Sequence, residues 1–183
     1  MSAGTSPTPL PVPRLLHPPV LLRAFTSADV GAVREAAGDP YVVATTTVPA
    51  EPDDAALLAF VARQHERSRR GSGWSLAVAD EVTDRCVGQV GLWPAGDGRA
   101  TVGYWTVPSV RGLGYASAAL RAVTGWAVLV PGVDRLELAV EPWNAASLAV
   151  GAAAGFRRTV LVPGYLEVDG VRRDMVVLER APG

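Results

Sequence analysis

Three short apolar stretches in the middle of the chain restrict the possible folds more than any other feature of the sequence. They are Trp74–Ala79, Arg85–Trp93 and Ala100–Val107, and the segments Asp80–Asp84 and Gly96–Gly98 separate them. Apolar or alternating runs bounded by Asp and Gly are typical of strands joined by tight turns. The pattern therefore predicts an antiparallel meander over residues 74–107.

Helical and strand-like segments flank this meander on both sides. Thr26 is an N-cap candidate, and Leu57, Leu58 and Val61 recur at helical spacing. The further predicted elements are a strand over Val20–Phe25, helices over 26–37 and 51–69, a helix that ends near Val130, a strand over Arg135–Val140, a helix over Ala145–Ala154, and strands over Phe156–Tyr165 and Val171–Glu179. The order β-α-α-β-β-β-α-β-α-β-β indicates an α/β chain of the α+β kind.

The length of 183 residues and the 49% share of hydrophobic residues favour one domain with a sizeable core. We predict that this domain spans residues 19–183 and that the proline-rich residues 1–18 form a flexible arm. The chain does not start with a charged segment followed by an apolar run, and no apolar stretch is long enough for a membrane span. The expected location is the cytoplasm, with no membrane partner.

Composition excludes several classes of chemistry. All 17 basic residues are Arg, so Schiff-base and pyridoxal phosphate chemistry and a P-loop lysine are excluded. Cys86 is the single cysteine and His17 and His65 are the two histidines, so no metal site is expected. The net charge of −1 argues against a dedicated nucleic-acid binder. The lack of Lys and Ile, with Asn144 as the single asparagine, is typical of a GC-rich bacterial genome.

The segment Val102–Val123 carries the most specific chemical signal. A strand ends before Pro108, a short loop contains Gly112 and Gly114, and a helix follows at once. Glycines allow the backbone to turn tightly, and the first N–H groups of a helix attract anions. Arg111 can add a bidentate phosphate contact. The segment predicts a cradle for a pyrophosphate that uses no lysine, although an ordinary helix start with glycines fits the motif alone equally well.

This segment resembles the acetyl-CoA loop of the GNAT family of N-acetyltransferases. Arg111, Gly114 and Ala116 match the family pattern Gln/Arg-x-x-Gly-x-Gly/Ala. The preceding Gly103-Tyr104-Trp105 is similar to the branch that acetylates the N-termini of ribosomal proteins (RimJ and RimL). A second family motif is matched by Asn144-Ala-Ala-Ser147 together with Gly155-Phe156.

The resemblance covers the chain from about Val20 to Glu179. It implies the GNAT fold, which is a central mixed and mostly antiparallel sheet of about seven strands flanked by four helices. It also implies that acetyl-CoA is the cofactor and that no metal takes part.

In this family the strand before the loop separates from its neighbour, and the pantetheine arm of the coenzyme lies in the gap. The matching strands here are Gly103–Val107 and Arg135–Val140, and free backbone N–H groups around residues 105–107 are expected to face the thioester. Asn144 is in addition a good helix N-cap. The residues expected to contact the coenzyme are Trp105, Thr106, Val107, Arg111, Gly112, Leu113, Gly114, Tyr115, Ala116, Ser117, Asn144 and Ser147.

Many family members use a tyrosine as the general acid, and this chain has Gly151 at that position. Ser147 is therefore the predicted acid, although a serine near a helix start is equally often a cap. Glu141 and Glu167 are the candidates for the base, each of which could instead be a surface carboxylate, and we expect a weak or solvent-assisted base. The residues expected to line the acceptor site are Tyr41, Trp93, Tyr165 and Glu167.

The resulting hypothesis is an N-acetyltransferase in which the amine attacks acetyl-CoA directly in a ternary complex, because Cys86 fits a core position rather than a covalent carrier. The acceptor is a protein N-terminus or a small-molecule amine, and a homodimer is compatible with this branch. The missing tyrosine leaves an alternative open, a non-catalytic acyl-CoA-binding module that regulates or binds a partner. The basic cluster of Arg67, Arg69 and Arg70 is interpreted as a solvated helix end.

Overall fold

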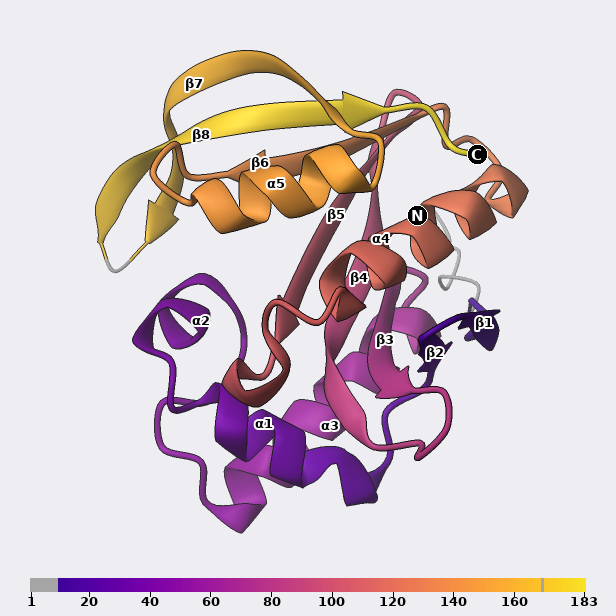
Figure 1. The fold of residues 1–183 in the computed structure, drawn as a ribbon, viewed down its shortest axis with the longest axis vertical. Coiled ribbons are helices and arrows are strands. Elements are labelled where there is room, and N and C mark those ends of the chain that lie inside the picture. Colours follow the sequence, from indigo (N-terminus) through magenta and orange to yellow (C-terminus); the bar gives the residue numbers. More distant parts are fainter. Residues whose placement is uncertain (1–9, 169) are drawn as a thin grey trace, which may run out of the picture.

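The computed structural model describes residues 10–168 and 170–183, and Figure 1 shows their arrangement. One eight-stranded sheet runs in the order β1-β2-β3-β4-β5-β6-β8-β7. Its strands are β1 (Leu15–His17), β2 (Val20–Arg23), β3 (Trp74–Asp80), β4 (Cys86–Gly96), β5 (Arg99–Thr106), β6 (Arg135–Val140), β7 (Arg157–Val168) and β8 (Val171–Arg180). The helices are α1 (Val30–Ala36), α2 (Pro40–Thr45), α3 (Asp54–Arg69), α4 (Tyr115–Trp126) and α5 (Ala145–Ala153), with short 3-10 turns η1 (Ser27–Asp29), η2 (Pro108–Val110) and η3 (Ala127–Leu129).

The predicted α/β fold with a mixed and mostly antiparallel sheet is confirmed, and the described residues contain one strand and one helix beyond those predicted. The extra strand, β1, pairs with β2 and lies inside the segment predicted as a flexible arm. Two further contacts fix this segment, because the Leu10 N–H donates to the Ser68 carbonyl and the Trp74 indole donates to the Pro11 carbonyl. Residues 1–9 of the predicted arm lie outside the described residues.

The extra helix is α2, in a region expected to be a loop. The Asp39 carboxylate accepts hydrogen bonds from the N–H groups of Tyr41 and Val42, and Pro40 occupies the first helical position. Proline fits the first turn of a helix because its missing N–H would have no helical partner there. Gly38-Asp39-Pro40 therefore ends one helix and also begins another, and only the second of these roles was not anticipated.

The meander of β3, β4 and β5 is antiparallel, as predicted. Its two inner glycines lie opposite each other, Gly91 against Gly103, and the Trp93 ring occupies the space where their side chains would be. A Cβ at Gly91 would overlap this ring, so the glycines allow Trp93 to lie across the sheet.

The sheet divides between β5 and β6. These strands pair in parallel only over Arg99–Thr101 and Arg135–Glu137, although both continue for several residues beyond. In Figure 1, β5 runs from the upper part, formed by β6, β7, β8 and α5, to the lower part, formed by β1–β4 and α1–α3. The separation predicted between Gly103–Val107 and Arg135–Val140 is therefore present, and it leaves backbone groups of both strands without a strand partner.

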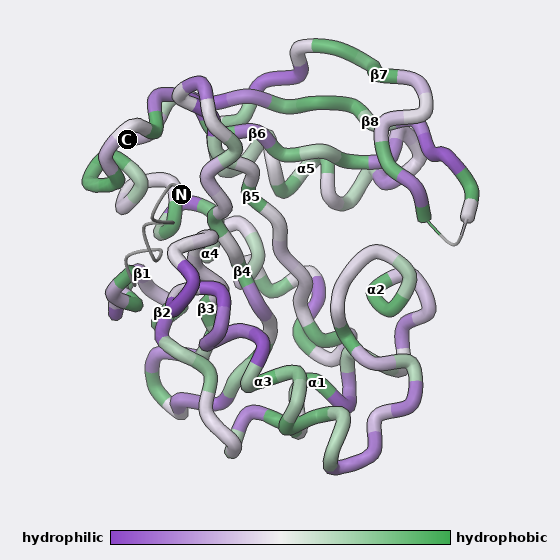
Figure 2. The backbone as a smooth tube through the Cα atoms, turned by 180° about the vertical axis from the view of Figure 1, so that it is seen from behind, coloured by the Kyte–Doolittle hydropathy of each residue, from purple (hydrophilic) through white to green (hydrophobic). Residues whose placement is uncertain are grey.

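The core is apolar and continuous across the sheet, and Figure 2 shows hydrophobic stretches in the strands and in α5 with hydrophilic loops between them. The helix α3 packs on β3, and α4 packs on β2, β4 and β5. The rings of Phe25 and Phe60 meet edge to face with centroids 5.6 Å apart. These contacts hold the meander against the helices and fix the positions from which the gap opens.

Candidate functional site

Two adjoining cavities lie on either side of the gap. The first, about 560 Å³, is formed by α2, the end of β5, the start of α4 and one face of α5, and we call it the cradle cavity. The second, about 450 Å³, is formed by α2, α3, β5, β6 and the β7–β8 hairpin, and we call it the gap cavity. Both are lined by the same six residues, which are Tyr41, Thr45, Thr46, Tyr104, Asn144 and Ser147.

The cradle cavity contains a turn with unpaired backbone donors. Gly112 and Gly114 have φ values of 80° and 85°, in the left-handed region that glycine adopts without strain, and Gly114 caps α4 with no side chain. The N–H groups of residues 112 and 114–117 donate to no acceptor within the described residues, whereas those of Arg111 and Leu113 donate within the turn. A Cβ at either glycine would meet nothing within 4 Å. The turn therefore offers five free donors at the positive end of a helix, a donor set that suits a diphosphate.

Ten of the twelve residues predicted to contact the coenzyme line the cradle cavity. The two others are Val107, which is fully buried, and Leu113, which is exposed. The Val107 N–H donates to the Val87 carbonyl of β4 at 2.9 Å and so does not face the gap. Since successive N–H groups of a strand point to opposite edges, the donor that faces the gap at this end of β5 is that of Thr106.

Arg111 is held at the rim of the cradle cavity by a carboxylate. Its Nη2 lies 2.6 Å from the Asp39 Oδ2, while the other oxygen of Asp39 caps α2. Burial alone would raise the pKa of Asp39, but the Arg111 guanidinium and the N–H groups of Tyr41 and Val42 outweigh it and lower the pKa. One side chain thus links the predicted phosphate-binding arginine to the helix that covers both cavities.

Asn144 and Ser147 lie at the start of α5, between the two cavities. The Asn144 Oδ1 accepts from the Ser147 N–H at 3.0 Å, so Asn144 is the helix N-cap. Gly151, one turn further along α5, faces the core, because a Cβ there would lie 3.1 Å from Leu178 and 3.2 Å from Leu138. A side chain at this position would therefore be tightly packed against both leucines.

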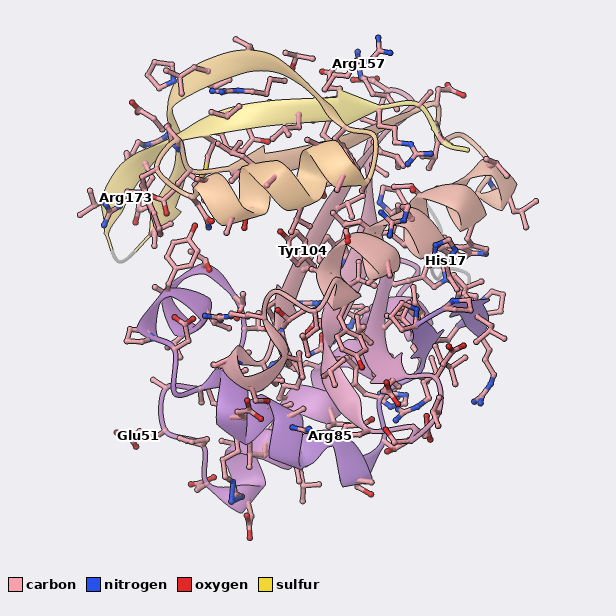
Figure 3. All side chains as sticks on the ribbon, in the orientation of Figure 1. His17, Glu51, Arg85, Tyr104, Arg157 and Arg173 are labelled. Carbon is pink, nitrogen blue, oxygen red and sulfur yellow. The ribbon has the colours of Figure 1, made fainter. Side chains whose placement is uncertain are left out.

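Tyr104 is the site residue to which the sequence assigned no role. It lies on β5 near the middle of the view in Figure 3. Its hydroxyl is buried and makes no hydrogen bond of acceptable geometry within the described residues. Burial raises the pKa of Tyr104, and Ser147 lies close enough to act in the opposite direction. A buried hydroxyl without a partner is costly, and here it borders both cavities.

Tyr41 and Glu141 form a second polar pair beside the junction of the cavities. Burial and the nearby Glu141 carboxylate raise the pKa of Tyr41 to about 12, while Asn144 acts in the opposite direction. Glu141 is only 4% exposed and lines neither cavity, whereas Tyr41 lines both, so Glu141 lies on the protein side of Tyr41. The Tyr41 ring also meets the exposed Trp143 edge to face at 5.0 Å, and Trp143 lines the cradle cavity.

The remaining predicted acceptor residues are divided by the fold. Trp93 and Glu167 line the gap cavity, whereas Tyr165 is exposed and lines neither cavity. The gap cavity also contains Arg67 and Gln89, which the sequence analysis did not select. No nearby motif in the sequence identifies these two residues, because α3 and β4 come close to the gap only in the folded protein.

Within residues 10–168 and 170–183, no three His, Cys, Asp or Glu side chains gather as metal ligands would. No helix in these ranges has both the length and the apolar character needed to cross a bilayer.

Comparison with known proteins identifies the family. Residues 20–157 match the family model described as an acetyltransferase (GNAT) domain. A search of curated proteins finds no significant match. The solved structures with a similar fold include Mycobacterium smegmatis RimJ in complex with CoA-disulfide, at 26% identity and a TM-score of 0.77, with 93% of this chain and 86% of that chain covered.

Two further structures share the fold at lower identity. One is a putative ribosomal-protein-serine acetyltransferase from Vibrio cholerae, at 20% identity and a TM-score of 0.79, with 96% of this chain and 99% of that chain covered. The other is the microcin C7 self-immunity acetyltransferase MccE in complex with acetyl-CoA and AMP, at 14% identity and a TM-score of 0.77, with 90% and 93% covered. Since the family model spans more than half of the sequence and the fold agrees, the chain belongs to the GNAT acetyltransferase family.

Proposed function

We propose that this protein transfers an acetyl group from acetyl-CoA to a primary amine, by direct attack in a ternary complex. The observation that carries the proposal is the row of free N–H groups at residues 112 and 114–117, next to a gap in the sheet that leads into a second cavity. The cradle cavity suits a long coenzyme with a diphosphate, and the gap cavity suits the acceptor. Two proteins of similar fold support this assignment, since RimJ was solved in complex with CoA-disulfide and MccE in complex with acetyl-CoA.

Bound acetyl-CoA would supply the reactive thioester. The donors of Gly112 and Gly114–Ser117 would hold its diphosphate, with Arg111 adding a charged contact. The Thr106 N–H, at the free edge of β5, would hold the pantetheine arm or the thioester carbonyl by adding hydrogen bonds in the manner of a strand. The side chains of Asn144 and Trp143 would flank the arm on the other side.

The reaction joins the amine nitrogen to the acetyl carbon, breaks the carbon–sulfur bond and leaves a thiolate that needs a proton. Five of the residues that line both cavities carry a hydroxyl, namely Tyr41, Thr45, Thr46, Tyr104 and Ser147. The hydroxyls of Thr45 and Thr46 donate to backbone carbonyls of α2, and Tyr41 lies beside Glu141, which leaves the Tyr104 Oη and the Ser147 Oγ. The Tyr104 Oη carries a proton at neutral pH, since its pKa is raised and it gives that proton to no protein acceptor in the described residues. We assign Tyr104 as the proton donor, with Ser147 beside it as a second donor.

The amine must lose a proton before it attacks. Among the described residues, Glu167 is the carboxylate that lines the gap cavity, and it can accept this proton through solvent. Glu141 acts through Tyr41 as a positioning residue, and solvent in the gap cavity takes the proton. A covalent acetyl-enzyme is disfavoured, because burial raises the pKa of the Cys86 thiol to about 12 and keeps it protonated.

The direct test is release of free CoA thiol from acetyl-CoA in the presence of small amines and of peptides with free N-termini. We expect release that depends on the amine, with N-acetylated product detected by mass spectrometry. Stoichiometric CoA binding with no thiol release from any amine would favour the alternative, a non-catalytic acyl-CoA-binding module. The argument for this alternative is that the chain has Gly151, and not a tyrosine, at the position of the general acid that the family resemblance implies.

Substitutions of Asp39 are expected to separate its two roles. Asp39→Asn keeps a capping oxygen for α2 but removes the charge that holds Arg111, so CoA affinity should rise roughly two- to fivefold, the value of a partly exposed ion pair. Asp39→Ala removes the cap as well and should lower the free energy of unfolding by about 1 kcal/mol. Calorimetric titration with CoA and chemical denaturation measure the two effects. Weaker CoA binding by Asp39→Asn would show that Arg111 does not contact the diphosphate.

A further inference from the structure

Arg67 lies on the wall of the gap cavity and forms no ion pair with any of the described residues. It lies on α3 and is half-buried, and among the described residues that line this cavity only Arg67 and Glu167 are charged. Within residues 10–168 and 170–183, no carboxylate approaches the Arg67 guanidinium within 4.0 Å. Its neighbours at the end of α3 differ, since Arg69 and Arg70 both form ion pairs with Glu66. Arg67 therefore differs from Arg69 and Arg70, the two other residues of the basic cluster that the sequence predicted as a solvated helix end.

Neutral groups fix the orientation of this guanidinium. The Arg67 Nη1 donates to the Gln64 Oε1 at 2.9 Å and to the Ser75 Oγ at 2.8 Å. The guanidinium also lies over the Trp93 ring, 5.5 Å from its centroid. The Gln89 amide donates to the same Ser75 oxygen at 3.1 Å, which anchors that oxygen in turn. All of the side-chain hydrogen bonds of Arg67 in the described residues use Nη1, so Nε and Nη2 remain available.

An oriented guanidinium with free donors matches the flat, charged oxygens of a carboxylate or phosphate. The partners already present are neutral and do not offset the loss of hydration. Burial and the nearby Arg63 accordingly lower the pKa of Arg67, which remains positively charged at neutral pH. The cradle cavity is different, because there Arg111 and Asp39 neutralise each other. The uncompensated positive charge thus lies on the side of the gap away from the coenzyme cradle.

We propose that Arg67 binds an anionic group of the acceptor, so that the acceptor is an amine that also carries a carboxylate or a phosphate. This inference rests on the proposed acetyl transfer to an amine. The geometry fits such a molecule because the gap cavity joins the cradle cavity at Tyr41, Tyr104 and Ser147, where the amine would react. Glu167 comes from β7 and forms no ion pair with Arg67, so it can face the ammonium group of a zwitterion.

The test is equilibrium binding to the CoA-bound protein, measured by calorimetry with matched pairs of amines. One series compares α-amino acids with their amides, and a second compares aminoalkyl phosphates with the corresponding amino alcohols. A third compares short peptides with Glu or Gln at the second position. The first two series distinguish a carboxylate from a phosphate, and the third distinguishes a peptide from a small molecule. We expect the anionic member of at least one series to bind roughly 10- to 100-fold more tightly.

Variants assign the preference to Arg67. Arg67→Gln should reduce the affinity ratio of the preferred pair to near one, and Arg67→Lys should retain part of it. Arg69→Gln is the matched control, with the same change on the same helix at an exposed residue that lines neither cavity, and it should keep the full ratio. Unchanged CoA affinity and unchanged thermal unfolding of Arg67→Gln would show that the fold is intact.

Two outcomes would overturn the inference. One is equal affinity, or no binding, for both members of every pair. The other is a preference for anionic amines that survives in Arg67→Gln. A different result would overturn the proposed function, namely that no amine is acetylated in the thiol-release assay. Transfer to amines without any preference for an anionic group would leave the proposed function intact and remove only the role of Arg67.

Discussion

Gly114→Asp is expected to weaken CoA binding by at least about 100-fold. The residue has a φ of 85°, a conformation that costs a non-glycine residue about 1–2 kcal/mol, and its Cβ would enter the open space of the cradle cavity. The new carboxylate would occupy the free N–H groups and repel the diphosphate, at a further cost of about 1.5–3 kcal/mol. Calorimetric titration of the variant with CoA measures the loss.

Two companion variants separate the causes of this effect. Gly114→Ala introduces the backbone strain without the charge and should give an intermediate loss. Gly125→Asp makes the same change in the same helix at an exposed position outside both cavities, where a Cβ meets nothing within 4 Å, and should leave CoA binding unchanged. Full CoA affinity in Gly114→Asp would exclude the turn at Arg111–Ser117 as the phosphate site.

Tyr104→Phe is expected to lower kcat by about 100-fold or more while the Kd for CoA stays the same, because a positioned general acid typically contributes about 10²- to 10⁴-fold. Most buried hydroxyls stabilise a protein through a hydrogen bond, but this one has no partner in the described residues. Its removal should therefore leave the free energy of unfolding unchanged or slightly higher. Steady-state kinetics together with chemical denaturation would reveal this combination of lost activity and retained stability.

The control for Tyr104→Phe is Tyr165→Phe, at an exposed tyrosine that lines neither cavity. Ser147→Ala tests the neighbouring hydroxyl and should have a smaller effect. If Ser147→Ala abolishes turnover and Tyr104→Phe does not, the proton donor is Ser147. Because burial raises the pKa of Tyr104 above that of an ordinary tyrosine, wild-type kcat should not fall from loss of this proton anywhere in the neutral range.

Local sequence accounted for most of the fold and for the backbone geometry around the cradle cavity. The meander, the glycine turn and the Asn144 cap depend on residues close together in the chain, and the described structure contains all three. Val107 departs from the expectation because its N–H pairs with β4, and the edge to which a strand N–H points depends on the partner strand. The helix α2 was missed because Asp39-Pro40 is compatible with both the end of one helix and the start of the next.

The gap cavity depends on contacts between distant parts of the chain. The sequence determined which residues can bend, cap and donate, since backbone conformation and capping are decided within a few residues. Only the tertiary structure decided that Gly151 packs on Leu138 and Leu178. Within the described part of the chain it also decided that the Tyr104 hydroxyl is buried without a partner and that Arg67 lines the gap cavity with no carboxylate beside it. Burial and charge balance are sums over neighbours brought together by the sheet, and no short stretch of sequence contains them.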